Sequence, residues 1–263
     1  MAGSKGKFVW YELATSDKAA AETFYKNVVG WTMQDSGMVD FAYTILHAGE
    51  LPIGGLMTLP QAACDAGAKP GWMGYIGVED VDAKADAVAK AGGKIYRAPE
   101  DIPEVGRFAV VADPQGAVFT LFKGQGEEQP DAAPGANGHV GWHELLTTDH
   151  KAALAFYSGL FGWTKDESLD MGAMGIYQLF AYGSHAVGGM MDKPPAVPSP
   201  FWTFYFNVED IDAAVDRVKA GGGQVINGPM EVPGGAWIIQ ALDPQGVVFS
   251  LVAPPKAGTT STM

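Results

Sequence analysis

Short runs of alternating apolar and polar residues, each followed by a helical pattern, recur along this chain. Val9–Leu13 alternates as a half-buried strand does. Ala21, Phe24 and Val28 then follow at the spacing of one helical face, and Thr15–Asp17 supplies polar side chains that can cap a helix start. The pattern therefore predicts a strand and then a helix near the start of the chain.

The same pattern predicts further elements along the whole chain. Helices are expected over Asp80–Ala91, His150–Leu160 and Ile211–Ala220. Strands are expected over Tyr43–Ala48, Ile53–Met57, Trp72–Val78, Phe108–Ala112, Ala117–Phe122, Val140–Leu145, Tyr177–Ala181, Val187–Met191, Phe201–Val208, Trp237–Leu242 and Val247–Val252. A loop is expected around Cys64.

The two halves of the chain repeat each other. Val9–Trp31 matches Gly141–Trp163, and the turn Asp113–Gly116 recurs as Asp243–Gly246. A nearly constant offset across half a chain indicates duplication. We therefore expect four βαβββ modules of about 50 residues, paired into two domains. The pattern leaves open whether modules one and two pair, or modules one and four.

We expect a first domain over residues 1–123 and a second over 139–254. The Gly-, Pro- and acid-rich stretch 124–138 is typical of a linker, and residues 255–263 are typical of a loose tail.

Composition limits the classes of partner. The 263 residues carry a net charge of −13, which disfavours nucleic acid and is compatible with a cationic ligand. The N-terminus lacks an apolar signal core, and no long apolar run predicts a membrane span. A single cysteine, Cys64, excludes an internal disulfide and a cysteine-based metal site. We expect a cytoplasmic protein, with monomer or homodimer left open.

The repeated markers resemble those of the vicinal oxygen chelate superfamily, which includes glyoxalase I, extradiol dioxygenases and bleomycin resistance proteins. The markers are Phe24-Tyr25 with Gly30-Trp31, their copies Phe156-Tyr157 with Gly162-Trp163, and the Asp-Pro-Gln-Gly turns. The chain is most similar to tandem two-domain, glyoxalase-like or hydroxylase-like bacterial proteins. The resemblance implies an α+β fold in which paired modules form open eight-stranded barrels, each with a central cavity.

The resemblance also implies positions for metal ligands. In this chain those positions hold Trp10, Met73, Thr120, Trp142, Thr203 and Ser250, with Leu56/Met57 and Met190/Met191 at the remaining positions. Divalent cations prefer imidazole and carboxylate ligands, and a non-haem iron site needs two histidines and one carboxylate. We therefore predict no metal cofactor, with a divalent metal ion as the alternative.

Strand alternation predicts what faces each cavity instead. Phe8, Trp10 and Glu12 should share the cavity face of the first strand, and Trp142 and Glu144 that of its copy. Met73 and Tyr75, and their counterparts Thr203 and Tyr205, should face inward on the fifth strand of each half, with Thr120 and Ser250 on the last strands. The tryptophans either stack on a planar or cationic ligand or fill the barrel. The tyrosines either orient a ligand or pack.

Glu12 and Glu144 carry the sharpest hypothesis. A carboxylate beside tryptophan in a partly dry pocket should have a raised pKa, and would act as a general base or anchor a cationic group. The alternative is a solvated structural pair at a strand end.

Other candidate motifs favour structural interpretations. His139, His143 and His150 are expected on different faces and so cannot share an ion, with His143 pointing away from the cavity. Gly54-Gly55 and Gly188-Gly189 are expected to mark bends or close backbone approach, because no helix follows them to make a phosphate site.

We therefore expect a protein with two cavities that binds a small aromatic or cationic molecule without a catalytic metal. The alternative is an enzyme of this superfamily, such as a lyase, isomerase, hydroxylase or dioxygenase. It would use Glu12 or Glu144 as the base, with Tyr75 or Tyr205 at the oxyanion, or an unrecognised divalent metal. A third possibility is that one half only stabilises the other.

Overall fold

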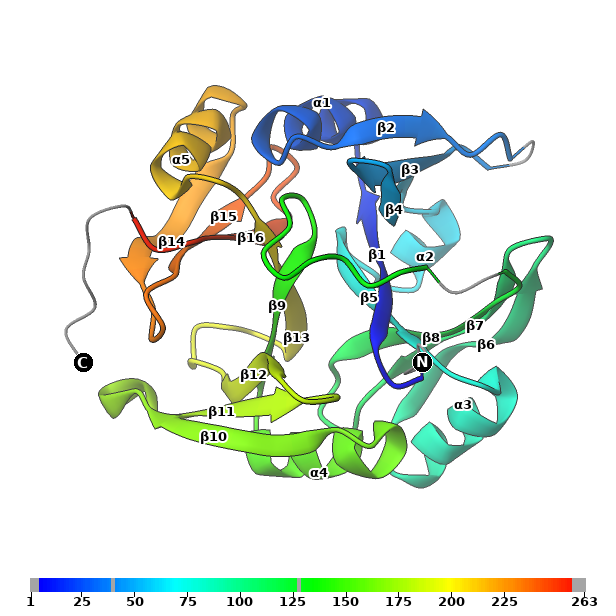
Figure 1. Cartoon of the computed structure of the whole chain (residues 1–263). Coiled ribbons are helices and arrows are strands. Elements are labelled where there is room, and N and C mark those ends of the chain that lie inside the picture. Colours follow the sequence, from blue (N-terminus) through cyan, green and yellow to red (C-terminus); the bar gives the residue numbers. More distant parts are fainter. Residues whose placement is uncertain (1–4, 39–40, 127–128, 257–263) are drawn as a thin grey trace. The chain divides into compact units, whose positions relative to one another are not determined.

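The computed structural model describes residues 5–38, 41–126 and 129–256. The last seven residues of the predicted tail and two residues of the predicted linker lie outside these ranges. The first half contains β1 (Phe8–Thr15), α1 (Lys18–Val28), β2 (Thr32–Asp35), β3 (Tyr43–Ala48), β4 (Leu51–Thr58), α2 (Gln61–Asp65), β5 (Gly71–Gly77), α3 (Val81–Lys90), β6 (Lys94–Ile102), β7 (Gly106–Ala112) and β8 (Val118–Gly124) (Figure 1).

The second half repeats this order. It contains β9 (Val140–Thr147), α4 (His150–Phe161), β10 (Thr164–Asp170), a 3-10 turn (Gly172–Met174), β11 (Ile176–Ala181), β12 (Ala186–Asp192), β13 (Phe201–Asn207), α5 (Ile211–Ala220), β14 (Gln224–Glu231), β15 (Trp237–Leu242) and β16 (Val248–Ala253). We name the four βαβββ repeats module 1 (β1–β4), module 2 (β5–β8), module 3 (β9–β12) and module 4 (β13–β16). The predicted four-module organisation is thus confirmed.

Each module contains one strand that the hydrophobic pattern did not indicate. These strands are β2, β6, β10 and β14, and each lies at the edge of a sheet. They are mostly exposed; in β10 only Leu169 is even half-buried. An exposed edge strand needs no apolar face, so alternation cannot reveal it. The predicted Cys64 loop also differs, because it contains the short helix α2.

The four longer helices begin in the same way. The side chains of Asp17, Asp80, Asp149 and Asp210 each accept a hydrogen bond from a backbone N–H in the first turn of the helix that follows. Such a cap satisfies one of the unpaired donors at a helix start, and it is typically worth about 1 kcal/mol. The predicted cap of the first helix, Thr15–Asp17, therefore resolves to Asp17.

The strands form two eight-stranded mixed sheets. The first has the order β2-β3-β4-β1-β5-β8-β7-β6 and the second the order β10-β11-β12-β9-β13-β16-β15-β14. Within each module the first strand runs parallel to the last, as β1 does to β4, and the remaining pairs are antiparallel. Neither sheet closes on itself, because β2, β6, β10 and β14 end the two orders. The expected α+β fold of paired modules is confirmed.

The compact units of the chain do not coincide with the two sheets. Unit 1 contains residues 1–10, 73–131 and 143–202, and therefore most of modules 2 and 3. Unit 2 contains residues 11–72, 132–142 and 203–263, and therefore most of modules 1 and 4. The question of module pairing has two answers: sheets join modules 1 with 2 and 3 with 4, whereas compact units join 2 with 3 and 1 with 4.

A buried tyrosine links the two modules of each unit. In unit 2, the Tyr25 hydroxyl donates to Asp243 Oδ2 at 3.1 Å and accepts from Trp72 Nε1 at 3.1 Å. In unit 1, the Tyr157 hydroxyl makes the same two bonds, to Asp113 Oδ2 at 3.1 Å and from Trp202 Nε1 at 3.0 Å.

The aspartate of each Asp-Pro-Gln-Gly turn has a second task. Asp113 Oδ1 accepts from the backbone N–H groups of Gln115 and Ala117, at 2.9 and 3.0 Å, and so closes its own turn. Burial raises the pKa of Asp113, against the lowering effect of these bonds. Burial likewise raises the pKa of Tyr157 well above its ordinary value. The tyrosine of each repeated Phe-Tyr motif and the aspartate of an Asp-Pro-Gln-Gly turn in the other half are therefore hydrogen-bonded to each other.

Candidate functional site

A buried glutamate on the first strand of each half accepts a hydrogen bond from a tyrosine two strands away. In unit 2, the Tyr43 hydroxyl on β3 donates to Glu12 Oε2 on β1 at 3.0 Å. In unit 1, the Tyr177 hydroxyl on β11 donates to Glu144 Oε2 on β9 at 3.0 Å. Glu12 is 9% exposed and Glu144 8%. A carboxylate that is this buried needs such a donor, because loss of hydration is otherwise costly.

The glycine pairs make room for these tyrosines. Gly55 pairs with Glu12 in the β1–β4 register, and a Cβ at Gly55 would lie 1.8 Å from the Tyr43 hydroxyl oxygen. A Cβ at Gly189 would lie 2.1 Å from the Tyr177 ring. Any side chain at these glycines would therefore push the tyrosine off the glutamate. The predicted close backbone approach is confirmed at Gly54 and Gly188, where a Cβ would lie 2.2 Å from a backbone carbonyl oxygen, whereas Gly55 and Gly189 make room for a side chain.

The tyrosines of these pairs were missed by the sequence analysis. Tyr43 and Tyr177 open their predicted strands, but they stand 31 and 33 residues after the glutamates that they contact, so no short motif joins them. The signal that could have found them is a tyrosine repeated in both halves, on the strand that hairpin pairing places beside the Gly-Gly strand.

The two tryptophans lie next to these pairs along the chain. Trp10 precedes Glu12 by two residues on β1, and Trp142 precedes Glu144 by two on β9, so strand alternation gives each pair of residues one face. Both tryptophans are half-buried, and so are Tyr43 and Tyr177. This part of the predicted site therefore keeps side-chain surface that a ligand can reach.

The predicted site residues of module 2 are more deeply buried. Tyr75 is 7% exposed and lies edge-on to Phe122, and Thr120 is fully buried. Among the residues that the structure describes, Thr120 Oγ1 has no hydrogen-bond partner. Met73, half-buried on β5, offers it no hydroxyl.

Module 4 has a hydrogen-bonded version of the same positions. Thr203 and Ser250 are buried, and their hydroxyl oxygens are 3.0 Å apart in a hydrogen bond. The Tyr205 hydroxyl accepts from Gln240 Nε2 at 2.9 Å, and Gln240 in turn accepts from Asn227 at 3.1 Å. Gln240 was not predicted; its counterpart in the first half is Val110, so the repeat gave no signal for it.

The histidines contact separate partners. His143 is 5% exposed, and its Nδ1 donates to the Val187 carbonyl at 2.8 Å. His150 Nδ1 lies 2.9 Å from Asp192 Oδ1. Burial lowers the pKa of His143 to about 4, and partial burial lowers that of His139.

One prediction for the first strand is wrong. Phe8 was placed on the cavity face with Trp10 and Glu12, but its ring stacks on His143 at 4.5 Å and lies 5.7 Å from Trp163. Trp163 itself stacks on Tyr157 of α4, so Phe8 belongs to the core beneath that helix. Phe8 begins β1, where strand alternation is a weak guide to direction.

The residues that the resemblance places at metal positions do not fit a divalent cation. Indole, thioether and neutral hydroxyl groups occupy these positions. All three hydroxyl residues, Thr120, Thr203 and Ser250, are buried, and the last two are hydrogen-bonded to each other. Within the described ranges, no group of three His, Cys, Asp or Glu side chains could hold a metal ion.

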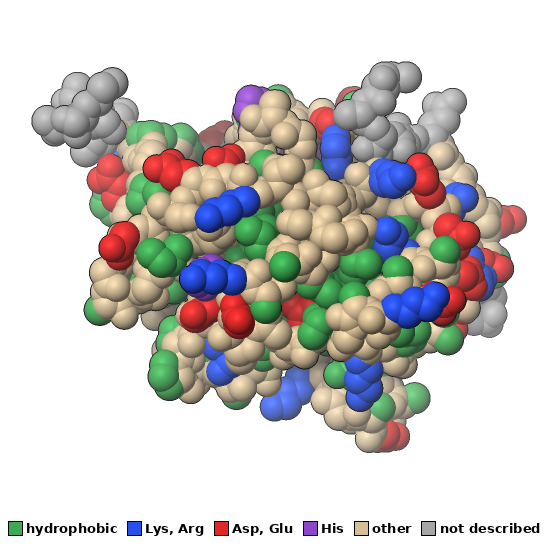
Figure 2. All heavy atoms as spheres, turned by 90° about the horizontal axis from the view of Figure 1, so that it is seen from below, with side chains coloured by type: hydrophobic (Ala, Val, Ile, Leu, Met, Phe, Trp, Pro, Cys, Tyr) green, Lys and Arg blue, Asp and Glu red, His purple; other side chains and the backbone are tan. Residues whose placement is uncertain are grey.

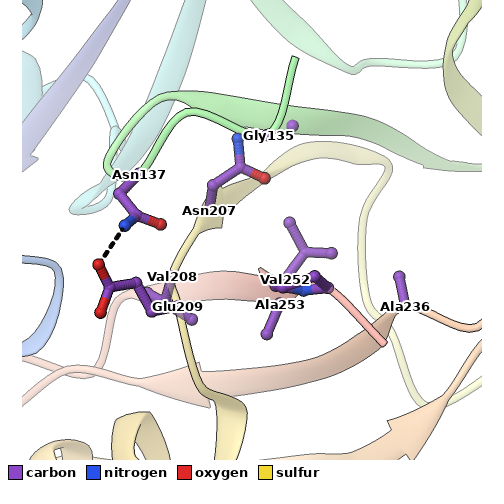
Figure 3. Close-up of a pocket in the computed structure, with 10 residues that line it drawn as sticks. Gly135, Asn137, Asn207, Val208, Glu209, Ala236, Val252 and Ala253 are labelled. Atoms are coloured by element: carbon purple, nitrogen blue, oxygen red, sulfur yellow. Dashed lines mark hydrogen bonds between the residues drawn. The ribbon is translucent and has the colours of Figure 1, made fainter. Parts of the chain in front are cut away.

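Two surface hollows lie apart from these residues. One, of about 420 Å³ in unit 2, is shown in Figure 3; Asn137 Nδ2 donates to Glu209 Oε1 at 2.9 Å on its wall. The other, of about 570 Å³ in unit 1, lies between α4 and the β10–β11 hairpin. On the face drawn in Figure 2, lysine and arginine side chains are interspersed with acidic ones rather than gathered in one basic area. None of the described helices has the length and apolar character needed to span a bilayer.

Comparisons with known proteins agree with this architecture. The profile of the Glyoxalase/Bleomycin resistance protein/Dioxygenase superfamily matches residues 7–121 and again 138–251. The chain is 34% identical over 259 residues to "Putative glyoxylase CFP32" of Mycobacterium tuberculosis, covering 93% of this chain and 94% of that protein. It is 31% identical over 275 residues to "Anthracycline biosynthesis protein DnrV" of Streptomyces peucetius, covering 97% and 98%.

A solved structure shows the same fold at low identity. The Mn(II)-bound glyoxalase from Novosphingobium aromaticivorans superimposes with a TM-score of 0.65 at 17% identity, covering 95% of this chain and 82% of that one. With both repeats matched by the profile and full-length relatives above 30% identity, the chain belongs to the Glyoxalase/Bleomycin resistance protein/Dioxygenase superfamily.

Proposed function

We propose that this protein binds a planar aromatic small molecule carrying a positive charge or hydrogen-bond donors, and that it does so without a metal ion. The observation that carries the proposal is the buried tyrosine–glutamate pair, built twice at equivalent places: Glu12 with Tyr43, and Glu144 with Tyr177. A fold held only by apolar packing would not need a carboxylate at either place, because burying one is costly.

The neighbouring tryptophans supply the aromatic part of the site. A half-buried indole beside a carboxylate favours a flat ligand that stacks on the ring and presents N–H or cationic groups to the oxygens. The net charge of −13 also favours a cationic ligand over an anionic one at these places. Two relatives are named anthracycline biosynthesis proteins, and an anthracycline is a fused-ring aromatic compound.

The absence of a metal from the proposal rests on donor chemistry. Trp10, Met73 and Thr120 stand at the ligand positions that the resemblance implies in the first half, and none of them is an imidazole or a carboxylate. Glu12 and Glu144 each accept a hydrogen bond from a tyrosine at one oxygen, and the proposal gives their remaining acceptor capacity to N–H or cationic groups of the ligand.

The test is a titration of intrinsic tryptophan fluorescence. We choose 9-aminoacridine as a planar cationic probe and anthracene-9-carboxylate as a planar anionic one. The expected result is quenching by the cation at concentrations at least about tenfold lower than by the anion, because the glutamates discriminate between them. Glu12→Gln with Glu144→Gln should remove that preference, whereas Glu50→Gln, on an exposed turn, should keep it. Equal binding of both probes, or an unchanged preference in the double variant, would overturn the proposal. So would one equivalent of iron, zinc, manganese or nickel in protein purified without chelator.

A second candidate is an acid–base enzyme that uses the same pairs. A buried carboxylate held by a tyrosine hydroxyl can act as a general base that removes a proton next to a carbonyl group. The relative named as a putative glyoxylase favours this reaction class. Its mark would be deuterium exchange at a carbon next to a carbonyl, lost in the Glu→Gln variants and partly restored by Glu→Asp. Ligand binding without any such exchange would contradict the enzyme function and favour the binding function.

A further inference from the structure

The hollow in unit 1 has an unusual lining for so acidic a chain. It measures about 570 Å³ and lies between one side of α4 and the β10–β11 hairpin. Its lining residues are His150, Lys151, Leu154, Ala155, Ser158, Lys165, Ser168, Ile176 and Gln178. The ionisable groups in this list are two lysines and a histidine, and no carboxylate belongs to it.

The equivalent space in module 1, between α1 and the β2–β3 hairpin, contains a side chain of the protein itself. Glu22 of α1 accepts there from Lys18 Nζ at 2.7 Å and from the Thr44 hydroxyl on β3. Burial raises the pKa of Glu22, but the hydrogen bonds from Lys18 and Thr44 outweigh it, so the pKa is lowered. Module 1 thus stabilises a carboxylate between its helix and its hairpin.

Module 3 lacks that carboxylate and has lysines at two nearby positions. Repeat alignment places Leu154 at the position of Glu22, so the helix no longer supplies an acid. Alignment also places Lys151 where module 1 has Ala19, and Lys165 where it has Met33. The same space therefore loses its internal acid and gains Lys151 and Lys165, while Lys18 of module 1 is replaced by His150.

Neither lysine is held in a salt bridge with any residue in the described ranges, although Lys151 lies close enough to Asp192 for their charges to interact. Both Lys151 and Lys165 are exposed. His150 is different, because its Nδ1 lies 2.9 Å from Asp192 Oδ1. Burial raises the pKa of Asp192, but the bonds from His150 and the charges of His150 and Lys151 together lower it.

The floor of the hollow is apolar and its hairpin wall is held in place. Leu154 is 9% exposed and Ile176 is 37% exposed, an exposure at which a large apolar side chain gains from being covered. Gln178 is buried, and its amide donates to the backbone carbonyls of Asp166 and Glu167 at 2.9 and 3.1 Å, at the bulge of β10. The wall that carries Lys165 is therefore fixed.

We propose that this hollow binds an amphiphilic carboxylate, a molecule with an aliphatic body and one carboxylate group. The carboxylate takes the role that Glu22 plays in module 1 and lies between Lys151 and Lys165, while the aliphatic body covers Leu154 and Ile176. Charge complementarity selects the anion, and the aliphatic floor selects the body.

Calorimetric titration of the full chain with decanoate tests this proposal. We expect one saturable site per chain, with decylammonium, the matched cation, binding at least about tenfold more weakly. Lys151→Gln with Lys165→Gln should weaken decanoate at least about fivefold, and Leu154→Glu, which restores the module 1 residue, at least about tenfold. Lys26→Gln with Lys90→Gln, a matched pair of helix lysines, should change nothing.

The outcomes are decisive in both directions. Loss of decanoate binding in both hollow variants, with circular dichroism unchanged, supports the proposal. Equal affinity for decanoate and decylammonium, unchanged affinity in the hollow variants, or no saturable decanoate site overturns it. Glu12→Gln with Glu144→Gln separates this site from the proposed aromatic site, because those changes should leave decanoate binding as it is.

Discussion

The buried imidazole of His143 should make the protein sensitive to mild acid. His143 is 5% exposed, stacks on Phe8 with an interplanar angle of 11°, and donates from Nδ1 to the Val187 carbonyl at 2.8 Å. A carbonyl can only accept, so the neutral imidazole is already able to donate this hydrogen bond. Protonation would put a positive charge in these buried surroundings, and burial lowers the pKa of His143 to about 4.

The magnitude follows from linkage. In the unfolded chain the imidazole has a pKa of about 6.5. Above that pH it is neutral in both states, so His143 causes no loss in the free energy of unfolding. As the pH falls, the unfolded chain takes up the proton first, and the folded state loses stability. At pH 5, protonation of this imidazole favours the unfolded state over the folded state by a factor of about 10^1.5. That factor lowers the free energy of unfolding by about 2 kcal/mol. The loss reaches about 3 kcal/mol once the pH is below the folded pKa.

Urea unfolding at pH 7.5, 6.5, 5.5 and 5.0 measures this effect. We expect the wild-type free energy of unfolding to fall by about 2 kcal/mol across the series. His143→Phe gives up the bond to Val187 and so begins less stable, but its pH dependence should be nearly flat over the same range. A His139→Phe variant separates the smaller effect of that partly buried imidazole. If His143→Phe loses as much stability as the wild type, the reasoning fails.

Three further predictions concern stability, each measured by urea unfolding at pH 7.5. Gly189→Ala places a Cβ where the Tyr177 ring now lies, and should cost about 1–3 kcal/mol; wild-type stability would contradict the contact. Tyr157→Phe leaves two buried polar groups without their shared partner, and should cost about 2–4 kcal/mol; a cost below ~0.5 kcal/mol would show that the triad is unimportant. Thr120→Val removes a buried hydroxyl that lacks a partner, whereas Thr203→Val breaks a pair, so the first should stabilise and the second destabilise, each by about 1–3 kcal/mol. Effects of the same sign would refute that contrast.

The repeat made most of the fold predictable. Two copies of each marker identified four modules, and apolar periodicity located the buried strands and the helices. It failed at the exposed edge strands, such as β10, because a strand that faces water on both sides leaves no periodic trace. The prediction for Phe8 failed for another reason: its ring lies against Trp163, which follows α4, and Trp202 of β13, and no local pattern carries that information.

The candidate site was predictable only in part. Strand alternation singled out Glu12 and Glu144, and both are buried and hydrogen-bonded. Their tyrosine partners depend on hairpin register, which is fixed by pairing across strands rather than by nearby residues. The network through Gln240 lies in one half alone, so the repeat could not point to it.

The bond from Tyr25 to Asp243 and its copy from Tyr157 to Asp113 each tie residues on opposite sides of the duplication. A molecule with only one copy could satisfy this tyrosine and this aspartate only by meeting a second molecule face to face. Because both copies lie in one chain, the same association is internal here, and its effective concentration does not depend on how much protein the cell makes. A half-length fragment would therefore be driven to self-associate, by the same contacts that now hold one polypeptide together.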